Sequence, residues 1–225
     1  MRFSENHRIK AVVFDFDGTL AVLNIDFALM KERVLRWMKG FGVDEKRIKE
    51  RYLLEIIDEV EGLLRQDRSS SEAGRFYEGA HQILREVEFE AAAEGRLIAG
   101  SKETLDYLRQ RGIKVGIVTR NCEEAVRRVF PNINAFSDAF VSRNSVKRVK
   151  PHPDHLMFVM NALRVSGEET LMVGDHVLDI LAGKGVGMKT VGVLTGYIKR
   201  EEFEKAGADY ILQNVVEVRE LVAPG

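Results

Sequence analysis

A short apolar run near the start of the chain, Ala11 to Phe14, constrains the fold most strongly, because it leads directly into the acidic turn Asp15-Phe-Asp-Gly-Thr19. A continuous run of apolar and β-branched residues is typical of a strand buried on both faces of a parallel sheet. In such sheets, ligands bind beyond the carboxyl ends of the strands. The run therefore predicts a central strand, and the acids that follow it are candidates for a functional site.

From about Gly95 onward, strand-like and helix-like segments alternate. We expect strands at 113–118, 139–141, 171–173, 190–193 and 210–212. Helices are expected at 101–111, after Asn121, from Pro153 and near 178–184, since Asn121 suits a helix cap and Pro153 a first helical turn. This alternation predicts an α/β fold built on a doubly wound parallel sheet.

The stretch between the first strand and the later strands has a different texture. It contains no strand-like run, and its apolar residues recur at helical spacing in three groups. These are Phe27, Met30, Val34, Met38 and Phe41; then Leu53, Ile56, Val60, Leu63 and Leu64; then Phe76, Ala80, Ile83, Leu84 and Val87. We expect a core over residues 1–21 and 96–225, with an inserted helical domain over residues 22–95.

The composition excludes several classes of protein. With 45% hydrophobic and 31% charged residues the chain can build a core, and its formal net charge of −1 gives no field that would recruit nucleic acid or an anionic membrane. No apolar run is long enough to cross a bilayer, and residues 1–8 show no secretory signal. The single cysteine, Cys122, excludes an intrachain disulfide. We expect a cytoplasmic monomer or homodimer that binds neither nucleic acid nor membrane.

Polar residues gather at the carboxyl ends of the predicted strands. Asp15 and Asp17 follow the first strand, Thr119 and Arg120 the second, Lys150 precedes the helix after the third, and Asp175 and Asp179 follow the fourth. Crowded carboxylates need a cation, and a phosphate carries charge that must be neutralised. Mg²⁺ prefers sparse carboxylate sites of this kind. The pattern indicates magnesium-dependent phosphoryl transfer.

Four segments, in order, resemble the four motifs of the haloacid dehalogenase superfamily of hydrolases: Asp15-Phe-Asp-Gly-Thr-Leu20, Thr119, Lys150-Pro151 and Gly174-Asp-His-Val-Leu-Asp179. The resemblance implies a Rossmann-like core, and residues 22–95 fall where that family inserts its first-type helical cap. The stretch from Gly174 to Gly196 resembles the phosphoglycolate phosphatase branch in particular.

The resemblance also implies a role for each matching residue. Asp15 would attack phosphorus and form an aspartyl-phosphate, while Asp17 would protonate the leaving alcohol and later activate water. Phosphate would be bound by Gly18, Thr119, Arg120 and Lys150. Mg²⁺ would be held by Asp15, the backbone carbonyl of Asp17, Asp175 and, directly or through water, Asp179. The implied reaction is hydrolysis of a small phosphorylated metabolite, which the sequence does not identify.

Three alternatives remain open at this point. Dehalogenation is disfavoured, because the dehalogenases that named the family lack an acid at the position of Asp17. A sugar phosphomutase is the nearest alternative, and it would require a bisphosphate activator. A phospho-accepting signalling module uses similar residues but places its acidic pair on the first strand. A catalytically idle relative that serves as a binding scaffold is the third, and the presence of all the core acids argues against it.

Some further polar residues have ordinary structural explanations. His152 and His155 are three residues apart, but Pro153 lies between them and no third ligand is near in sequence, so we do not expect a metal pair. Cys122 is expected to be structural, whereas His176 could contact substrate or face solvent.

Overall fold

The computed structural model describes residues 9–222. The expectation of no secretory signal concerns residues 1–8, which lie outside this range. The chain divides into two compact units: a core unit, Met1–Leu23 with Ala92–Gly225, and a helical unit, Asn24–Ala91. The sequence prediction set these boundaries at residues 22 and 95. The assignment of the core unit to catalysis and of the helical unit to capping stays a prediction.

The core unit is built on a six-stranded sheet in the order β5-β4-β1-β6-β7-β8, in which every pair is parallel. The strands are β1 (Ala11–Asp15), β4 (Lys114–Val118), β5 (Ala139–Val141), β6 (Thr170–Gly174), β7 (Lys189–Val193) and β8 (Tyr210–Leu212). The strand order reverses at β1, which is the point where parallel α/β sheets commonly bind ligands. The predicted doubly wound parallel α/β fold is therefore confirmed.

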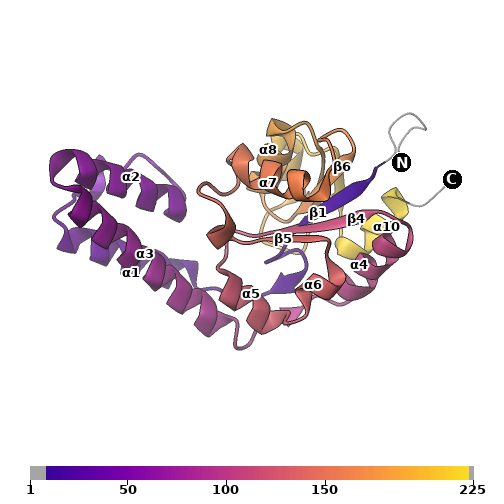
Figure 1. Ribbon diagram of the computed structural model, residues 1–225, viewed down its shortest axis with the longest axis horizontal. Helices are drawn as coiled ribbons and strands as arrows, with labels where there is room; N and C mark the ends of the chain where they lie inside the picture. Colours follow the sequence, from indigo (N-terminus) through magenta and orange to yellow (C-terminus); the bar gives the residue numbers. More distant parts are fainter. Residues whose placement is uncertain (1–8, 223–225) are drawn as a thin grey trace. The chain divides into compact units, whose positions relative to one another are not determined.

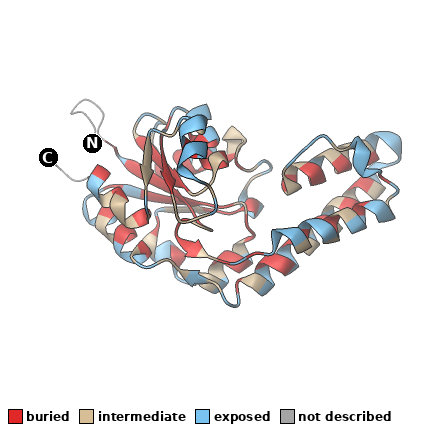
Figure 2. Cartoon of the chain, turned by 180° about the vertical axis from the view of Figure 1, so that it is seen from behind, coloured by how far each residue is buried: buried red, intermediate tan, exposed pale blue. Residues whose placement is uncertain are grey.

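Helices cover both faces of this sheet. They are α4 (Ser101–Gln110), α5 (Glu123–Val129), α6 (Ile133–Phe136), α7 (Pro153–Leu163), α8 (Val177–Gly185), α9 (Arg200–Ala206) and α10 (Val218–Leu221). Figure 1 shows α7 and α8 on one face, with α4, α5, α6 and α10 on the other. Strand β1 is consequently enclosed, and every residue from Ala11 to Phe14 is 0% exposed, as the red strands of Figure 2 illustrate. This enclosure explains why its sequence is apolar without alternation.

Two local predictions had opposite outcomes. Pro153 is the first residue of α7, as expected from its fixed backbone angle. The predicted helix cap at Asn121 is wrong, because α5 begins at Glu123 after Cys122. The backbone N–H of Asn121 instead donates to Thr119 Oγ1 at 3.1 Å, which draws this residue back toward the end of β4.

One pair of strands was not predicted. Strands β2 (Ala21–Val22) and β3 (Arg96–Leu97) form a two-residue antiparallel ladder. A strand this short carries no period-2 pattern that could be read from sequence. The pair joins the two segments of the core unit on either side of the helical unit in sequence. Two short 3₁₀ turns, η2 (Arg143–Ser145) and η3 (Val215–Glu217), complete the core unit.

The helical unit contains α1 (Phe27–Gly40), a 3₁₀ turn η1 (Glu45–Arg47), α2 (Leu53–Asp67) and α3 (Ser70–Ala91). The predicted apolar positions are mostly buried, but Phe27 is 58% exposed because it lies on the first turn of α1. An aromatic cluster fixes α1 against α3: the rings of Phe41 and Phe76 lie 5.6 Å apart, and Trp37 Nε1 donates to the Phe76 carbonyl at 3.0 Å. No helix within residues 9–222 is long and apolar enough to cross a membrane.

The close approach of α8 to the sheet depends on Gly183. A Cβ atom at Gly183 would lie 2.7 Å from Cγ2 of Thr190 on β7 and 3.0 Å from Cβ of Met172 on β6. At Gly185, on the same helix, a Cβ atom would have nothing within 4 Å. The two glycines therefore offer a matched pair.

We expect Gly183→Ala to lower the free energy of unfolding by about 1–3 kcal/mol, because the added methyl overpacks the core. Gly185→Ala should leave it unchanged or raise it by up to about 1 kcal/mol, because alanine favours the helix. Urea unfolding of both variants measures the difference. Equal stabilisation by the two substitutions would show that α8 does not pack this closely on the sheet.

Candidate functional site

The candidate site forms where three neighbouring strands end. Asp15 is the last residue of β1 and pairs with Val118, so Thr119 follows beside it at the end of β4. On the other side, Phe14 pairs with Val173 of β6, and Asp175 follows two residues later. Parallel pairing thus brings residues from distant parts of the sequence to one edge of the sheet.

Three carboxylates crowd this edge. Asp15, Asp175 and Asp179 each offer an oxygen, and these oxygens lie within 4.8 Å of one another. Burial raises the pKa of Asp15 to about 7, an effect that the charge of Asp179 increases and that of Lys150 opposes. Burial also raises the pKa of Asp175 well above its ordinary value, together with the charges of Asp15 and Asp179. These carboxyl groups resist being ionised together, which is the environment that a bound cation relieves.

Lys150 lies between two of these acids. Its Nζ is 2.6 Å from Oδ1 of Asp15 and 2.6 Å from Oδ1 of Asp179, and the residue is 2% exposed. Burial alone would lower the pKa of Lys150, but the two carboxylates raise it, so the side chain stays an ammonium. One ammonium does not balance three carboxylates. The donor set therefore fits a hard divalent cation, which binds carboxylate oxygens.

The oxygens of Asp179 already have partners. Oδ1 accepts from Lys150, and Oδ2 accepts from the backbone N–H of His176 at 3.1 Å. His176 caps α8 in return, because its Nδ1 accepts from Leu178 N at 3.2 Å. This geometry gives His176 a structural explanation, and it leaves Asp179 to act on a cation mainly through its charge or through water.

Asp175 is enclosed by two glycines from different strand ends. A Cβ atom at Gly18 or at Gly196 would lie 2.1 Å from Oδ2 of Asp175. Gly18 also has φ of +81°, which a side chain would strain. The hydroxyl of Thr19 donates to Oδ1 of Asp175 at 3.3 Å. Sequence reasoning gave Thr19 and Gly196 no role in the site, although Gly196 follows the end of β7 and so obeys the same strand-end rule.

The remaining predicted residues lie around this cluster in differing arrangements. Asp17 is not one of the three crowded acids, and its Oδ1 accepts from Leu23 N at 2.9 Å. The N–H of Gly18 donates to the Ala21 carbonyl at 2.7 Å, so its predicted contribution to phosphate binding has no support from this geometry. The hydroxyl of Thr195 donates to the Gly18 carbonyl, a contact that the sequence did not predict.

Thr119 and Arg120 differ in what they contact. Thr119 is 1% exposed, and its Oγ1 accepts from Asn121 N, which leaves the hydroxyl hydrogen for another acceptor. The Arg120 guanidinium donates to the backbone carbonyl of Lys150. The phosphate-binding roles of both residues stay predictions.

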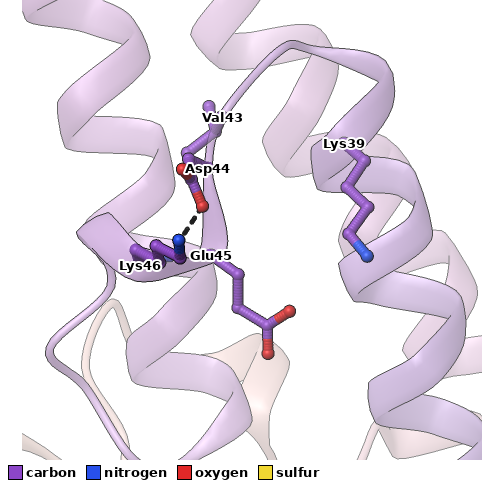
Figure 3. A pocket seen from close by; sticks show the side chains of 5 residues that line it. All are labelled: Lys39, Val43, Asp44, Glu45 and Lys46. Atoms are coloured by element: carbon purple, nitrogen blue, oxygen red, sulfur yellow. Dashed lines mark hydrogen bonds between the residues drawn. The ribbon is translucent and has the colours of Figure 1, made fainter.

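A cavity of about 450 Å³ lies elsewhere, in the helical unit. Figure 3 shows its lining, Lys39, Val43, Asp44, Glu45 and Lys46, where the turn η1 follows α1. Two lysines and two acids line it, and Asp44 Oδ1 is occupied by Lys46 N at 3.0 Å. None of the predicted site residues belongs to this cavity.

Comparison with known proteins gives a consistent family. Residues 9–187 match the family described as haloacid dehalogenase-like hydrolase. The chain is 37% identical over 127 residues to the pyrophosphatase PpaX of Halalkalibacterium halodurans, a match that covers 55% of this chain and 58% of that protein. The chain thus spans little more than half the length of this relative and of the PpaX of Bacillus mycoides, of which it covers 54%.

Matches along the whole chain are weaker in identity. A Clostridium perfringens protein provisionally given the same name is 29% identical over 221 residues, covering 95% of this chain and 97% of that one. The crystal structure of a HAD phosphatase from Thermococcus onnurineus has a TM-score of 0.60 and 24% identity, covering 94% of this chain and 97% of that one, and so shares the fold. Because the family match spans most of the sequence, this chain belongs to the haloacid dehalogenase-like hydrolases.

Proposed function

We propose that this protein is a Mg²⁺-dependent phosphatase that hydrolyses a small phosphorylated metabolite through a phosphoaspartate on Asp15. The observation that carries the proposal is the contact of Asp15 with Lys150, 2.6 Å apart, inside a group of crowded acids at the strand ends. Membership of a hydrolase family and relatives named as phosphatases support it. A cytoplasmic location and a monomeric or dimeric state stay predictions.

Each reacting group has a position that suits its proposed role. The carboxylate of Asp15 attacks phosphorus, so an O–P bond forms to Asp15 as the bond to the leaving oxygen breaks. Asp17, two residues on and half-buried, gives that oxygen a proton and later takes one from the water that cleaves the phosphoaspartate. Lys150 keeps its positive charge and offsets the negative charge that gathers on phosphate oxygens.

Four groups are suited to hold Mg²⁺. These are the carboxylates of Asp15, Asp175 and Asp179 and the backbone carbonyl of Asp17. When bound, the ion supplies positive charge that permits an anionic phosphate to approach anionic carboxylates. Thr119, whose hydroxyl hydrogen can point away from Asn121, is placed to donate to a phosphate oxygen.

Two substrate classes are favoured by different observations. The stretch from Gly174 to Gly196 resembles phosphoglycolate phosphatases, which favours a phosphomonoester. The relatives named PpaX are called pyrophosphatases, which favours inorganic pyrophosphate as the second candidate. Both share the transferred phosphoryl group and differ only in the leaving oxygen.

A panel of phosphoglycolate, sugar phosphates, nucleotides and pyrophosphate distinguishes these candidates. We expect phosphate release from at least one of them in the presence of Mg²⁺, without any bisphosphate activator. The measurement is phosphate released per enzyme, with Asp15→Asn as the matched inactive control. Phosphate release that depends on a sugar bisphosphate would instead indicate the phosphomutase.

The two acids of the first motif should give separable defects. Asp15→Asn should abolish phosphoenzyme formation, because an amide is a poor nucleophile. Asp17→Asn keeps an oxygen that can accept from Leu23 N but loses the acid–base group, which is commonly worth ~10²–10⁴-fold in rate. With an easily departing leaving group, the phosphoenzyme mass shift should accumulate in Asp17→Asn. Phosphate attached to any other residue in a quenched time course would refute the assignment of the nucleophile.

The raised pKa of Asp15 predicts how stability responds to pH and metal. The pKa rises from 3.8 to about 7 on folding, so the metal-free folded state binds protons more firmly than the unfolded chain. This contribution to stability is complete at low pH and is lost as pH rises toward 7. Mg²⁺ competes with these protons, so it should raise the melting temperature more at about pH 8 than at about pH 5.5.

Thermal unfolding with and without Mg²⁺ at the two pH values provides the measurement. Asp175→Asn is the matched variant, because it keeps the size of the side chain and removes one negative charge. It should lose most of the Mg²⁺-induced rise, yet be more stable than metal-free wild type at the higher pH. An undiminished Mg²⁺ effect in this variant would place the metal elsewhere.

A further inference from the structure

The position of Lys150 depends on how its own backbone is bonded. The residue lies between η2 and α7, outside any helix or strand, so no regular ladder fixes it. Side chains bond both of its backbone groups instead. Its N–H donates to Nδ1 of His155 at 3.2 Å, and its carbonyl accepts from the Arg120 guanidinium.

His155 connects the Lys150 loop to the end of β5. It is 0% exposed on the first turn of α7, and its Nε2 lies 3.2 Å from the Val141 carbonyl. Because Nδ1 accepts from Lys150, the ring proton is on Nε2 and donates to Val141. The same carbonyl accepts the backbone N–H of Thr119 at 3.1 Å. One imidazole therefore ties together the two loops that carry Thr119 and Lys150.

The ring keeps this bonding pattern only while it is neutral. Burial lowers the pKa of His155 to about 3, and the nearby charges of Lys150 and Arg120 lower it further than burial alone would. A second proton would turn Nδ1 from an acceptor into a donor facing the N–H of Lys150. At neutral pH that proton is absent, so the acceptor persists.

We propose that His155 is a positioning residue: it fixes the backbone of Lys150 and thereby sets the ammonium between Asp15 and Asp179. The inference rests on the proposed function, because the ammonium matters only if phosphoryl transfer occurs there. His155 touches no reacting atom. It acts through Lys150 alone.

Three substitutions separate the two hydrogen bonds of the ring. His155→Leu removes both, His155→Asn retains an acceptor near the position of Nδ1, and His155→Gln retains a donor near Nε2. We expect His155→Leu to lower kcat by about 10- to 100-fold, as losses of supporting hydrogen bonds at active sites commonly do, with little change in KM. His155→Asn should recover more activity than His155→Gln, since it restores the bond to Lys150. Wild-type kcat in His155→Leu, or equal defects in Asn and Gln, would overturn the proposal.

A double-mutant cycle tests whether the effect passes through Lys150. In a Lys150→Met background, His155→Leu should cause no further loss of kcat, because the group that it positions is absent. The same fold-loss in both backgrounds would overturn the proposal. Val159→Ala is the matched control: it is fully buried on the same helix within the apolar core, so it should lower stability without lowering kcat.

Hydrogen exchange of the Lys150 amide tests the bond independently of activity. His155→Leu should speed this exchange, whereas Val159→Ala should not, when both are compared under conditions of equal stability. If wild type hydrolyses no substrate in the panel, the proposed function fails while the exchange result still decides the bond. If wild type is active and exchange and kcat are both unchanged in His155→Leu, the positioning role fails and the proposed function stands.

Discussion

The arrangement of the core unit depends on one buried charge, the ammonium of Lys150, at the edge where three strands end. Asp15 and Asp179 each accept from it at 2.6 Å, and neither acid could be ionised so deep in the protein without it. Removing one partner of such a group leaves an uncompensated buried charge, which is far more costly than losing a surface pair. The same balance leaves a net negative charge, and this residual charge is what suits the site to a divalent cation.

Strand β1 makes this concentration of charge possible. Its backbone is paired on both sides, to β4 and β6, and its side chains up to Phe14 are fully enclosed. A strand so constrained presents its last residue, Asp15, at a fixed place, and the neighbouring strands deliver Thr119 and Asp175 beside it. The rigid sheet thus supplies preorganisation, while the loops beyond it supply the chemical groups.

The sequence predicted the sheet well because each core strand carries a strong apolar run, and β5 and β8 have the predicted bounds. It failed where the signal is short or local. The β2–β3 ladder is two residues long, and Asn121 has the chemistry of a cap but is drawn to Thr119 instead. Phe27 fits a helical period yet lies on a first turn that is not covered within the helical unit.

The strand-end rule also found the predicted site residues but not what fixes them. His155 was weighed only as a metal ligand, because sequence spacing cannot show that a ring nitrogen faces a backbone N–H five residues earlier. The two glycines around Asp175 lie 178 residues apart in the numbering, and only the folded sheet brings them together. Positions were predictable from pattern, whereas contacts required the fold.

The interrupted order of the chain has a consequence for synthesis on the ribosome. Strand β1 emerges early, but its partners β4 and β6 begin only at Lys114 and Thr170. The helical unit, whose elements all lie within Asn24–Ala91, has no such wait and can fold as soon as it emerges. An apolar strand without neighbours is prone to aggregate. The nascent chain therefore carries its most apolar segment unpaired through much of translation, which makes it a natural client for chaperones at that stage.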